Sequence, residues 1–156
     1  MEPVITVVPA IEELGIGMAA GAEAYATGDR EAATMLLLEG IGGSDPRESF
    51  AETLPPDWLE QAIASVGTAM EVEAPALGAW AVTPEQVGSI GAPCLAVVGD
   101  QTGRVFADGI AWPVEHLRHV EQVTVPAATH MLQVVNPDSV ARSLGDFLRR
   151  HPMGPC

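Results

Sequence analysis

The chain has 156 residues, and 47% of them are hydrophobic, so it is long and apolar enough to form one domain with a core. This composition excludes a disordered chain. The formal net charge is −14 and lysine is absent, which excludes a surface of clustered cations for nucleic acid or an anionic membrane.

The first 90 residues favour helices. After a short β-rich run at 4–8, apolar residues recur at helical spacing over 11–22. Asp29 is a good N-cap residue, and the apolar stripe behind it predicts a second helix that ends near residue 39. The glycine-rich stretch 40–46 is expected to be a loop.

A third helix is predicted at about 57–69, after a pair of prolines. We expect Pro75, Pro84 and Gly91 to break the following sequence into short pieces. Residues 1–90 also hold 15 of the 21 acidic side chains, so the negative charge is concentrated in this helical half. Such an excess mainly favours solubility.

The last third of the chain has a β/α pattern. A continuous apolar run at 94–98, ended by Gly-Asp, is typical of a strand that is buried on both faces. We expect a helix at about 114–119 and a second strand at 122–125. Two strands joined by a short crossover helix predict a parallel pair with a right-handed connection.

A closing helix is predicted at 137–150. Asn136 is its expected N-cap, and Pro137 occupies the first helical position, where a missing N–H does no harm. One apolar face of this helix is predicted to be formed by Val140, Leu144, Phe147 and Leu148.

Three short motifs resemble the C-terminal portion of the α/β-hydrolases. They are Val97-Val98-Gly99-Asp100, Pro126-Ala127-Ala128-Thr129-His130 and Asn136-Pro137-Asp138-Ser139-Val140. The resemblance implies an α/β fold in which 1–90 form a mostly helical cap, 91–152 form the last two β/α units of an incomplete parallel sheet, and 153–156 are a tail. It also implies that His130 is the general base of a catalytic triad.

The resemblance leaves two candidates for the triad acid. The usual acid position after the strand falls at Thr102, and Asp100 lies two residues before it. Some members take the acid from the end of the preceding strand instead, and this chain opens with Met1-Glu2-Pro3. Either Glu2 or Asp100 would hold the imidazole tautomer and stabilise the imidazolium. A further departure is Ala127, where the family usually has glycine.

The nucleophile and the oxyanion loop of the family are not recognisable in the sequence. The nucleophile elbow needs Gly-x-Ser/Asp/Cys-x-Gly on a tight strand-to-helix turn. The nearest sequences surround Ser44 and Ser89, but each lacks one glycine in register and neither follows a predicted strand. We therefore expect a fragment that is inactive alone and has an exposed strand edge through which a homodimer can form.

The resemblance implies that the intact protein hydrolyses a small apolar ester, epoxide or halide without a cofactor. A different interpretation is a stand-alone, non-catalytic module whose acidic helical half binds a protein partner. The sequence upstream of Met1 distinguishes the two. An in-frame strand, elbow and helix favours the enzyme, and a stop codon favours the module.

Other residues carry weaker signals. Cys94 and Cys156 make no disulfide framework, and the sequence has neither a signal peptide nor a run of about 20 apolar residues, so we expect a cytoplasmic protein. His116 and His119 lack a third ligand at matching spacing, so no metal site is predicted. The glycines at 15–21 have the wrong spacing for a dinucleotide fingerprint and are interpreted as helix-packing residues.

Overall fold

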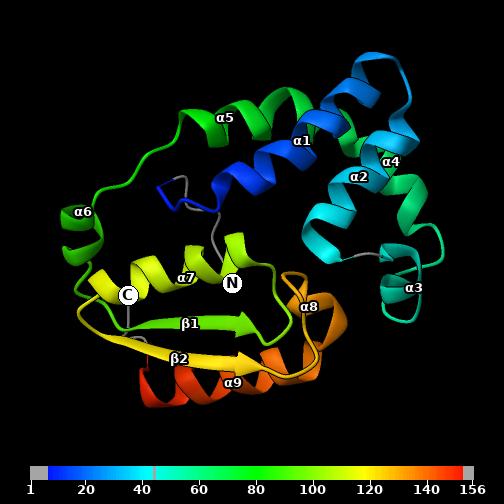
Figure 1. Ribbon diagram of the computed structural model, residues 1–156. Coiled ribbons are helices and arrows are strands. Elements are labelled where there is room, and N and C mark those ends of the chain that lie inside the picture. Colours follow the sequence, from blue (N-terminus) through cyan, green and yellow to red (C-terminus); the bar gives the residue numbers. More distant parts are fainter. Residues whose placement is uncertain (1–6, 44, 153–156) are drawn as a thin grey trace.

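The computed structural model describes residues 7–43 and 45–152 (Figure 1). In chain order its elements are α1 (Ile11–Ala26), α2 (Arg30–Gly42), α3 (Pro46–Ala51), α4 (Trp58–Thr68), the π-helical turn η1 (Ala69–Glu73), α5 (Ala74–Ala79), α6 (Pro84–Gly88), β1 (Cys94–Gly99), α7 (Arg104–His116), β2 (Val120–Val125), α8 (Leu132–Val135) and α9 (Pro137–Arg150). The mixed α/β class agrees with the sequence prediction. None of the helices in the described residues is long and apolar enough to cross a bilayer.

The two strands form the predicted parallel pair. Their register runs from Cys94 opposite Val120 to Gly99 opposite Val125, and α7 makes the crossover. Both strands therefore end at the same edge of the sheet. The run predicted as β-rich at 4–8 lies mostly outside the described residues, and its last two residues occupy turns and bends.

Each face of the sheet is covered by one helix, with α7 above and α9 below in Figure 1. On the α9 side, Val97 belongs to a buried cluster against which Val140 packs. On the α7 side, Ala96 and Val98 pack with Ile110. Successive side chains of a strand point to opposite faces, so burial of both faces explains the uninterrupted apolar run of β1.

The remaining helices form a layer that joins the sheet through α7. Asp29 caps α2 as predicted, because its carboxylate accepts a hydrogen bond from the backbone N–H of Ala32. Helix α2 packs against α1 and α4, and α3 packs against α8. The junction with α7 is a buried cluster that includes Phe106, with Leu14 and Ile41 packed against it.

The predicted bounds of the crossover helix, 114–119, are wrong. The crossover helix begins ten residues earlier, at Arg104, and ends at His116. Its buried residues Phe106, Gly109 and Ile110 recur at helical spacing, which is the signal that the sequence prediction overlooked. Pro113 lies inside the helix and has no N–H to donate to the carbonyl of Gly109, four residues earlier.

The predicted break at Pro75 is also wrong. Helices α4 and α5 are joined end to end by η1, in which the backbone N–H of Ala74 donates to the carbonyl of Ala69, five residues earlier. A proline in a regular α-helix clashes with the carbonyl four residues before it, here that of Glu71. The wider π-turn gives the ring room and lets the helix continue.

The closing helix has the predicted bounds and cap, but its apolar face is only partly buried. Phe147 is buried, whereas Leu144 and Leu148 are 48% and 42% exposed. A sheet of two strands is too narrow to cover the whole stripe of the helix. The structure also differs locally from the prediction. Helix α2 extends to Gly42, into the expected loop, and the sequence analysis did not predict the short helix α8.

Candidate active site

His130 lies at the carboxyl edge of the parallel sheet. It follows the last residue of β2, Val125, by five positions, and α8 begins two residues later. The side chain is half-buried. This is the position that the sequence motif predicted for the histidine, at the edge where loops after parallel strands present functional groups.

The imidazole of His130 stacks on the ring of Phe106. The two ring centroids are 3.7 Å apart and the planes differ by 12°. Phe106 is 1% exposed and belongs to the first turn of α7, which directly follows the loop after β1. The stack fixes the plane of the imidazole and shields one of its faces from water.

The loops after β1 and β2 are hydrogen-bonded to each other. The backbone N–H of Asp100 donates to the carbonyl of Val125 at 3.0 Å, and that of Gln101 donates to the carbonyl of Ala128 at 2.9 Å. The backbone N–H of Ala128 donates to the carboxylate of Asp100 at 3.3 Å. The loop that carries His130 is therefore held by the loop that carries Asp100.

The structure brings Asp100 to the histidine loop, where its carboxylate binds the backbone of Ala128. Glu2, the other candidate acid, lies outside the described residues. The choice of triad acid therefore stays a prediction. The carboxylate of Asp108, which follows Asp100 by eight residues, forms an ion pair with Arg104 at 3.5 Å.

Gly99 permits the close approach of the two loops. A Cβ at this position would overlap the carbonyl oxygen of Ala128 and would lie 2.7 Å from that of Thr129. The sequence analysis did not assign this role to Gly99. A glycine that ends a buried strand is a signal of close backbone approach, although it does not identify the segment that approaches.

The far end of the histidine loop is anchored by α9. The side-chain amide of Asn136 donates to the carbonyl of Pro126 at 3.0 Å, and its oxygen accepts from the backbone N–H of Ser139 at 3.3 Å. Between these anchors, Ala127 has φ of +51°. This is the left-handed region that favours glycine, the residue expected there from the family motif.

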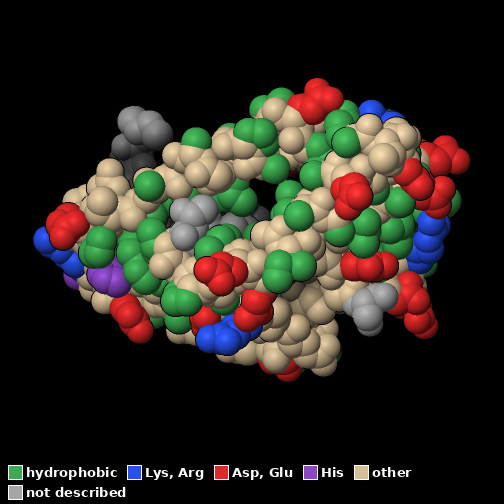
Figure 2. Space-filling model, turned by 45° about the horizontal axis from the view of Figure 1, so that its top comes forward, with side chains coloured by type: hydrophobic (Ala, Val, Ile, Leu, Met, Phe, Trp, Pro, Cys, Tyr) green, Lys and Arg blue, Asp and Glu red, His purple; other side chains and the backbone are tan. Residues whose placement is uncertain are grey.

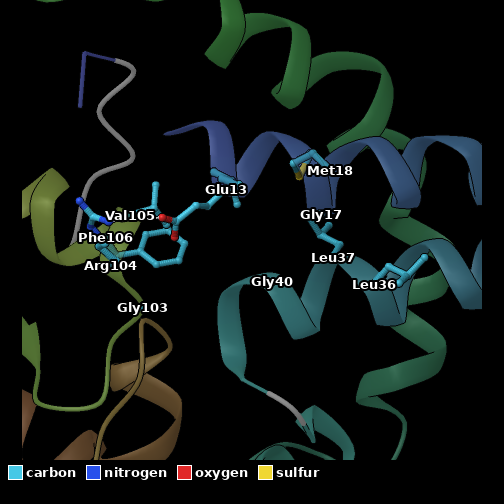
Figure 3. Close-up of a pocket in the computed structure, with 11 residues that line it drawn as sticks. Glu13, Gly17, Met18, Leu36, Leu37, Gly40, Gly103, Arg104, Val105 and Phe106 are labelled. Atoms are coloured by element: carbon cyan, nitrogen blue, oxygen red, sulfur yellow. Dashed lines mark ion pairs between the residues drawn. The ribbon is translucent and has the colours of Figure 1, made fainter. Parts of the chain in front are cut away.

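Two adjoining cavities matter here: one lies between the helical layer and the start of α7, and the other lies within the helical layer. The smaller encloses about 170 Å³, and Phe106 and the ion pair of Glu13 with Arg104 line it (Figure 3). The larger is an apolar groove of about 610 Å³ bounded by α1, α2, η1 and α5. The two share Leu14, Met18 and Leu37 in their walls. The apolar groove thus adjoins the pocket whose wall stacks on His130.

Neither serine of the near-elbow sequences is placed as a nucleophile in the described residues. Ser89 precedes β1, and its hydroxyl donates to the carbonyl of Gln86 at 2.7 Å. It lies at the amino edge, and a six-residue strand separates the two edges by roughly 17 Å. Ser44 lies outside the described residues.

No group of three His, Cys, Asp or Glu side chains that could hold a metal occurs in the described ranges. Of the two histidines three residues apart, His116 approaches the carbonyl of Trp112 at 2.7 Å through Nδ1, and His119 is exposed. The glycines near 15–21 lie within α1 as interpreted, but among them only Gly21 packs closely, with Met70 3.2 Å from its Cβ position.

No protein-family model and no curated protein matches the chain. Solved structures do match. One is the 2-hydroxy-6-oxo-6-phenylhexa-2,4-dienoate hydrolase BphD from Rhodococcus sp. strain RHA1, with 21% identity and a TM-score of 0.58 over 85% of this chain and 49% of that chain. Another is Est816, described as an N-acyl homoserine lactone degrading enzyme, with 25% identity and a TM-score of 0.56 over 86% of this chain and 53% of that chain.

The chain has an α/β-hydrolase fold. It spans about half the length of the α/β-hydrolase structures that it matches. In this fold β1 and β2 are neighbouring strands of a parallel sheet, and the described residues contain these two strands of it. The fold relationship agrees with the resemblance found in the three sequence motifs.

Proposed function

We propose that the chain supplies the cap and the general-base portion of an α/β-hydrolase, with His130 as the base. The observation that carries the proposal is the position of His130 at the carboxyl edge, where its ring stacks on Phe106 and hydrogen bonds between loops hold the backbone of Ala128, two residues before it. An imidazole held in one orientation is what proton abstraction from a hydroxyl or a water requires.

The reaction needs a nucleophile and an oxyanion hole from a further part of the sheet. In the proposed mechanism, His130 deprotonates either a hydroxyl nucleophile or a water, and in ester hydrolysis by a hydroxyl nucleophile it later gives that proton to the leaving group. Either Glu2 or Asp100 stabilises the imidazolium, and helices α1–α5 act as the cap. The substrate class is a small apolar ester, epoxide or halide, and the fold alone does not choose among them.

The first experiment is to read the gene upstream of Met1 and to express the chain together with any in-frame segment that contains a nucleophile elbow. Hydrolysis of short p-nitrophenyl esters by the longer chain should fall by about 10³-fold or more in His130→Ala. His116→Ala, which removes a histidine at the other edge, is the matched control and should retain activity. A stop codon directly before Met1 would instead favour the non-catalytic, protein-binding module.

The 156-residue chain alone should give no ester hydrolysis above background. Loss of a triad nucleophile removes most of the rate enhancement. Turnover that disappears in His130→Ala would contradict this expectation and would require a nucleophile within the chain, with Ser44 and Ser89 the first residues to replace.

A further inference from the structure

We infer that the apolar groove binds an uncharged, chain-like apolar molecule and that Glu73 excludes anions from it. The groove lies among helices α1, α2 and α5, and Figure 2 shows hydrophobic side chains around a hollow on this face. Its volume of about 610 Å³ is within the range of small-molecule sites, roughly 300–1,000 Å³. That this ligand is a substrate rests on the proposed function, whereas binding does not.

The lining of the groove defines the chemistry of the ligand. Nine of the residues that line it are apolar, and they are contributed by three separate helical segments: Leu14, Met18, Leu37, Ile41, Ala69, Ala74, Ala76, Leu77 and Trp80. The tenth is Glu73, the one ionisable side chain among the described lining residues. Burying a carboxylate or a phosphate of the ligand beside Glu73 would combine loss of hydration with like-charge repulsion.

A compensating cation is not available in the described walls of the groove. The nearest arginine along the cavities is Arg104, which lines the smaller pocket and not the groove. Its guanidinium lies 3.7 Å from the carboxylate of Glu13 and 3.5 Å from that of Asp108. Two carboxylates thus already balance its charge, so it adds little attraction for an anionic ligand.

The π-turn places Glu73 at the groove. Ala69, Glu73 and Ala74, at its two ends, all line the groove, while Glu71 accepts a hydrogen bond from Tyr25 on the opposite side. One turn of backbone therefore places the exposed Glu73 on the wall of the groove and Glu71 in a helix-packing contact. π-turns within helices occur frequently at functional sites, and this one is placed at the ligand cavity.

The groove adjoins the pocket that contains the stacking partner of the candidate base. Leu14, Met18 and Leu37 form the shared wall between the groove and the smaller pocket, and Phe106 lines that pocket and stacks on His130. A molecule with its apolar chain in the groove and its head group in the smaller pocket would lie beside Phe106, the ring on which His130 stacks. For the proposed hydrolase this describes an uncharged substrate with an alkyl chain, such as an ester.

The binding test uses the uncharged fluorophore N-phenyl-1-naphthylamine, titrated into the purified chain. We expect saturable binding, displacement by 1-decanol, and at least about 10-fold weaker displacement by decanoate, because the two competitors differ only in their head group. Glu73→Gln should improve displacement by decanoate several-fold and leave decanol unchanged. Equal competition by decanol and decanoate would overturn the inference, and so would stronger competition by decylamine than by decanol.

Two variants locate the bound probe. Leu77→Asp places a charge in the groove and should weaken probe binding about 10-fold or more, whereas Val72→Asp makes the same change at a 61% exposed residue outside the lining and should not. Ala76→Trp fills the groove from an exposed position and should also weaken binding, which covers the case in which Leu77→Asp unfolds. Equal effects of Val72→Asp and Leu77→Asp would assign the probe to another surface.

The outcome is independent of the proposed function. Probe binding requires no nucleophile and no turnover. If the longer chain hydrolyses esters without His130 while the binding results hold, the proposed base fails and the groove assignment stands. If His130 is required for hydrolysis but Leu77→Asp leaves probe binding unchanged, the groove assignment fails alone.

Discussion

Ala127 illustrates how a single residue sets the path of the loop before His130. Its φ of +51° is unfavourable for a residue with a Cβ, by roughly 1–2 kcal/mol relative to the right-handed region. The hydrogen bonds of Ala128 to the loop after β1 hold this conformation in place. The strain lies three residues before the candidate base.

Replacement of Ala127 by glycine should raise the free energy of unfolding by up to about 1 kcal/mol, because glycine adopts positive φ without a steric cost. Urea denaturation measures the change. Ala128→Gly is the control: Ala128 is 0% exposed and packs in the core below the sheet, so its replacement should destabilise the protein. A less stable Ala127→Gly would mean that the loop is not held in the left-handed region.

At Gly99 the requirement is space for the neighbouring backbone, whereas at Ala127 it is a positive φ. Gly99→Ala should destabilise the protein by about 1–3 kcal/mol, because the new methyl group meets the backbone of Ala128 and Thr129. Thermal denaturation of the variant checks this loss. Gly15→Ala serves as the comparison, since nothing lies within 4 Å of its Cβ position in α1, and it should be neutral or stabilising.

Helix α9 holds the histidine loop at one end and strand β2 at the other. Asn136 both caps the helix and binds the carbonyl of Pro126. At the other end of α9, Arg150 and His151 bind Glu121 of β2, with His151 Nε2 2.6 Å from the carboxylate. Polar contacts at both ends thus fix the helix across the strand.

Asn136→Ala should lower the free energy of unfolding by about 1 kcal/mol or more, since it removes a helix cap and the bond to Pro126. Asn136→Asp keeps an oxygen for the cap and loses only the amide donor, so its loss should be smaller. Chemical denaturation of both variants separates the two contributions. Equal losses would show that the cap itself contributes little.

The contacts of Glu121 should make stability depend on pH. The hydrogen bond from Arg150, and after it that from His151, lowers the pKa of the Glu121 carboxyl below its ordinary value. A lowered folded-state pKa contributes stability above the ordinary pKa of the carboxyl, and this contribution disappears as the pH falls through the lowered value.

Glu121→Gln should therefore melt at a lower temperature than the parent protein at pH 7, and the difference should shrink on acidification toward pH 3. Glu60→Gln changes an exposed carboxylate on α4 and provides the comparison. A difference between parent and Glu121→Gln that is constant across this range would show that the ionised carboxylate does not provide the stabilisation.

The sequence predicted those elements whose signals are local. Strand β1 has a continuous apolar run, strand β2 has β-forming residues and helix α9 has a cap motif, and the structure contains all three. The sequence did not predict features that depend on the surrounding structure. The π-turn before Pro75 depends on how the backbone accommodates the proline ring, and the exposure of Leu144 depends on the width of the sheet.

The candidate site divides in the same way. The position of His130 follows from a short motif after a strand, so the sequence was sufficient to predict it. Its contacts were not predictable, because Phe106 is 24 positions away in the chain and the clearance at Gly99 depends on the backbone of another loop. The choice between Glu2 and Asp100 as the triad acid was not predictable for the same reason, because the contact between acid and histidine joins residues far apart in the chain.

At the scale of the whole molecule, the described sheet has a strand edge on β1 that β2 does not cover. The backbone N–H of Cys94 donates to the carbonyl of His119, just before β2, and that of Asp100 donates to the carbonyl of Val125, the last residue of β2. Because a parallel strand bonds to its neighbour through alternate residues, Leu95 and Val97 direct their amides toward the other edge. This edge is where a homodimer, or a further strand of a longer chain, is expected to pair.

Hydrogen exchange followed by NMR tests whether this edge is open in the isolated chain. In dilute solution the amides of Leu95 and Val97 should exchange faster than those of Ala96 and Val98, which face β2. Raising the protein concentration should slow Leu95 and Val97 selectively if two chains pair there, with a matching increase in light scattering. Equal protection of all four amides at low concentration would mean that another segment already covers the edge.

The π-turn also has a consequence for how the protein can change during evolution. One residue corresponds to 100° of rotation around an α-helix of 3.6 residues per turn. Deletion of the exposed Val72 would remove the extra residue of the turn and rotate Leu77 and Trp80 by about that angle relative to α4. A single-codon deletion in the helical layer would thus change the residues that line the apolar groove, and the helix would have to kink at Pro75, whose ring would lose the room that the π-turn provides.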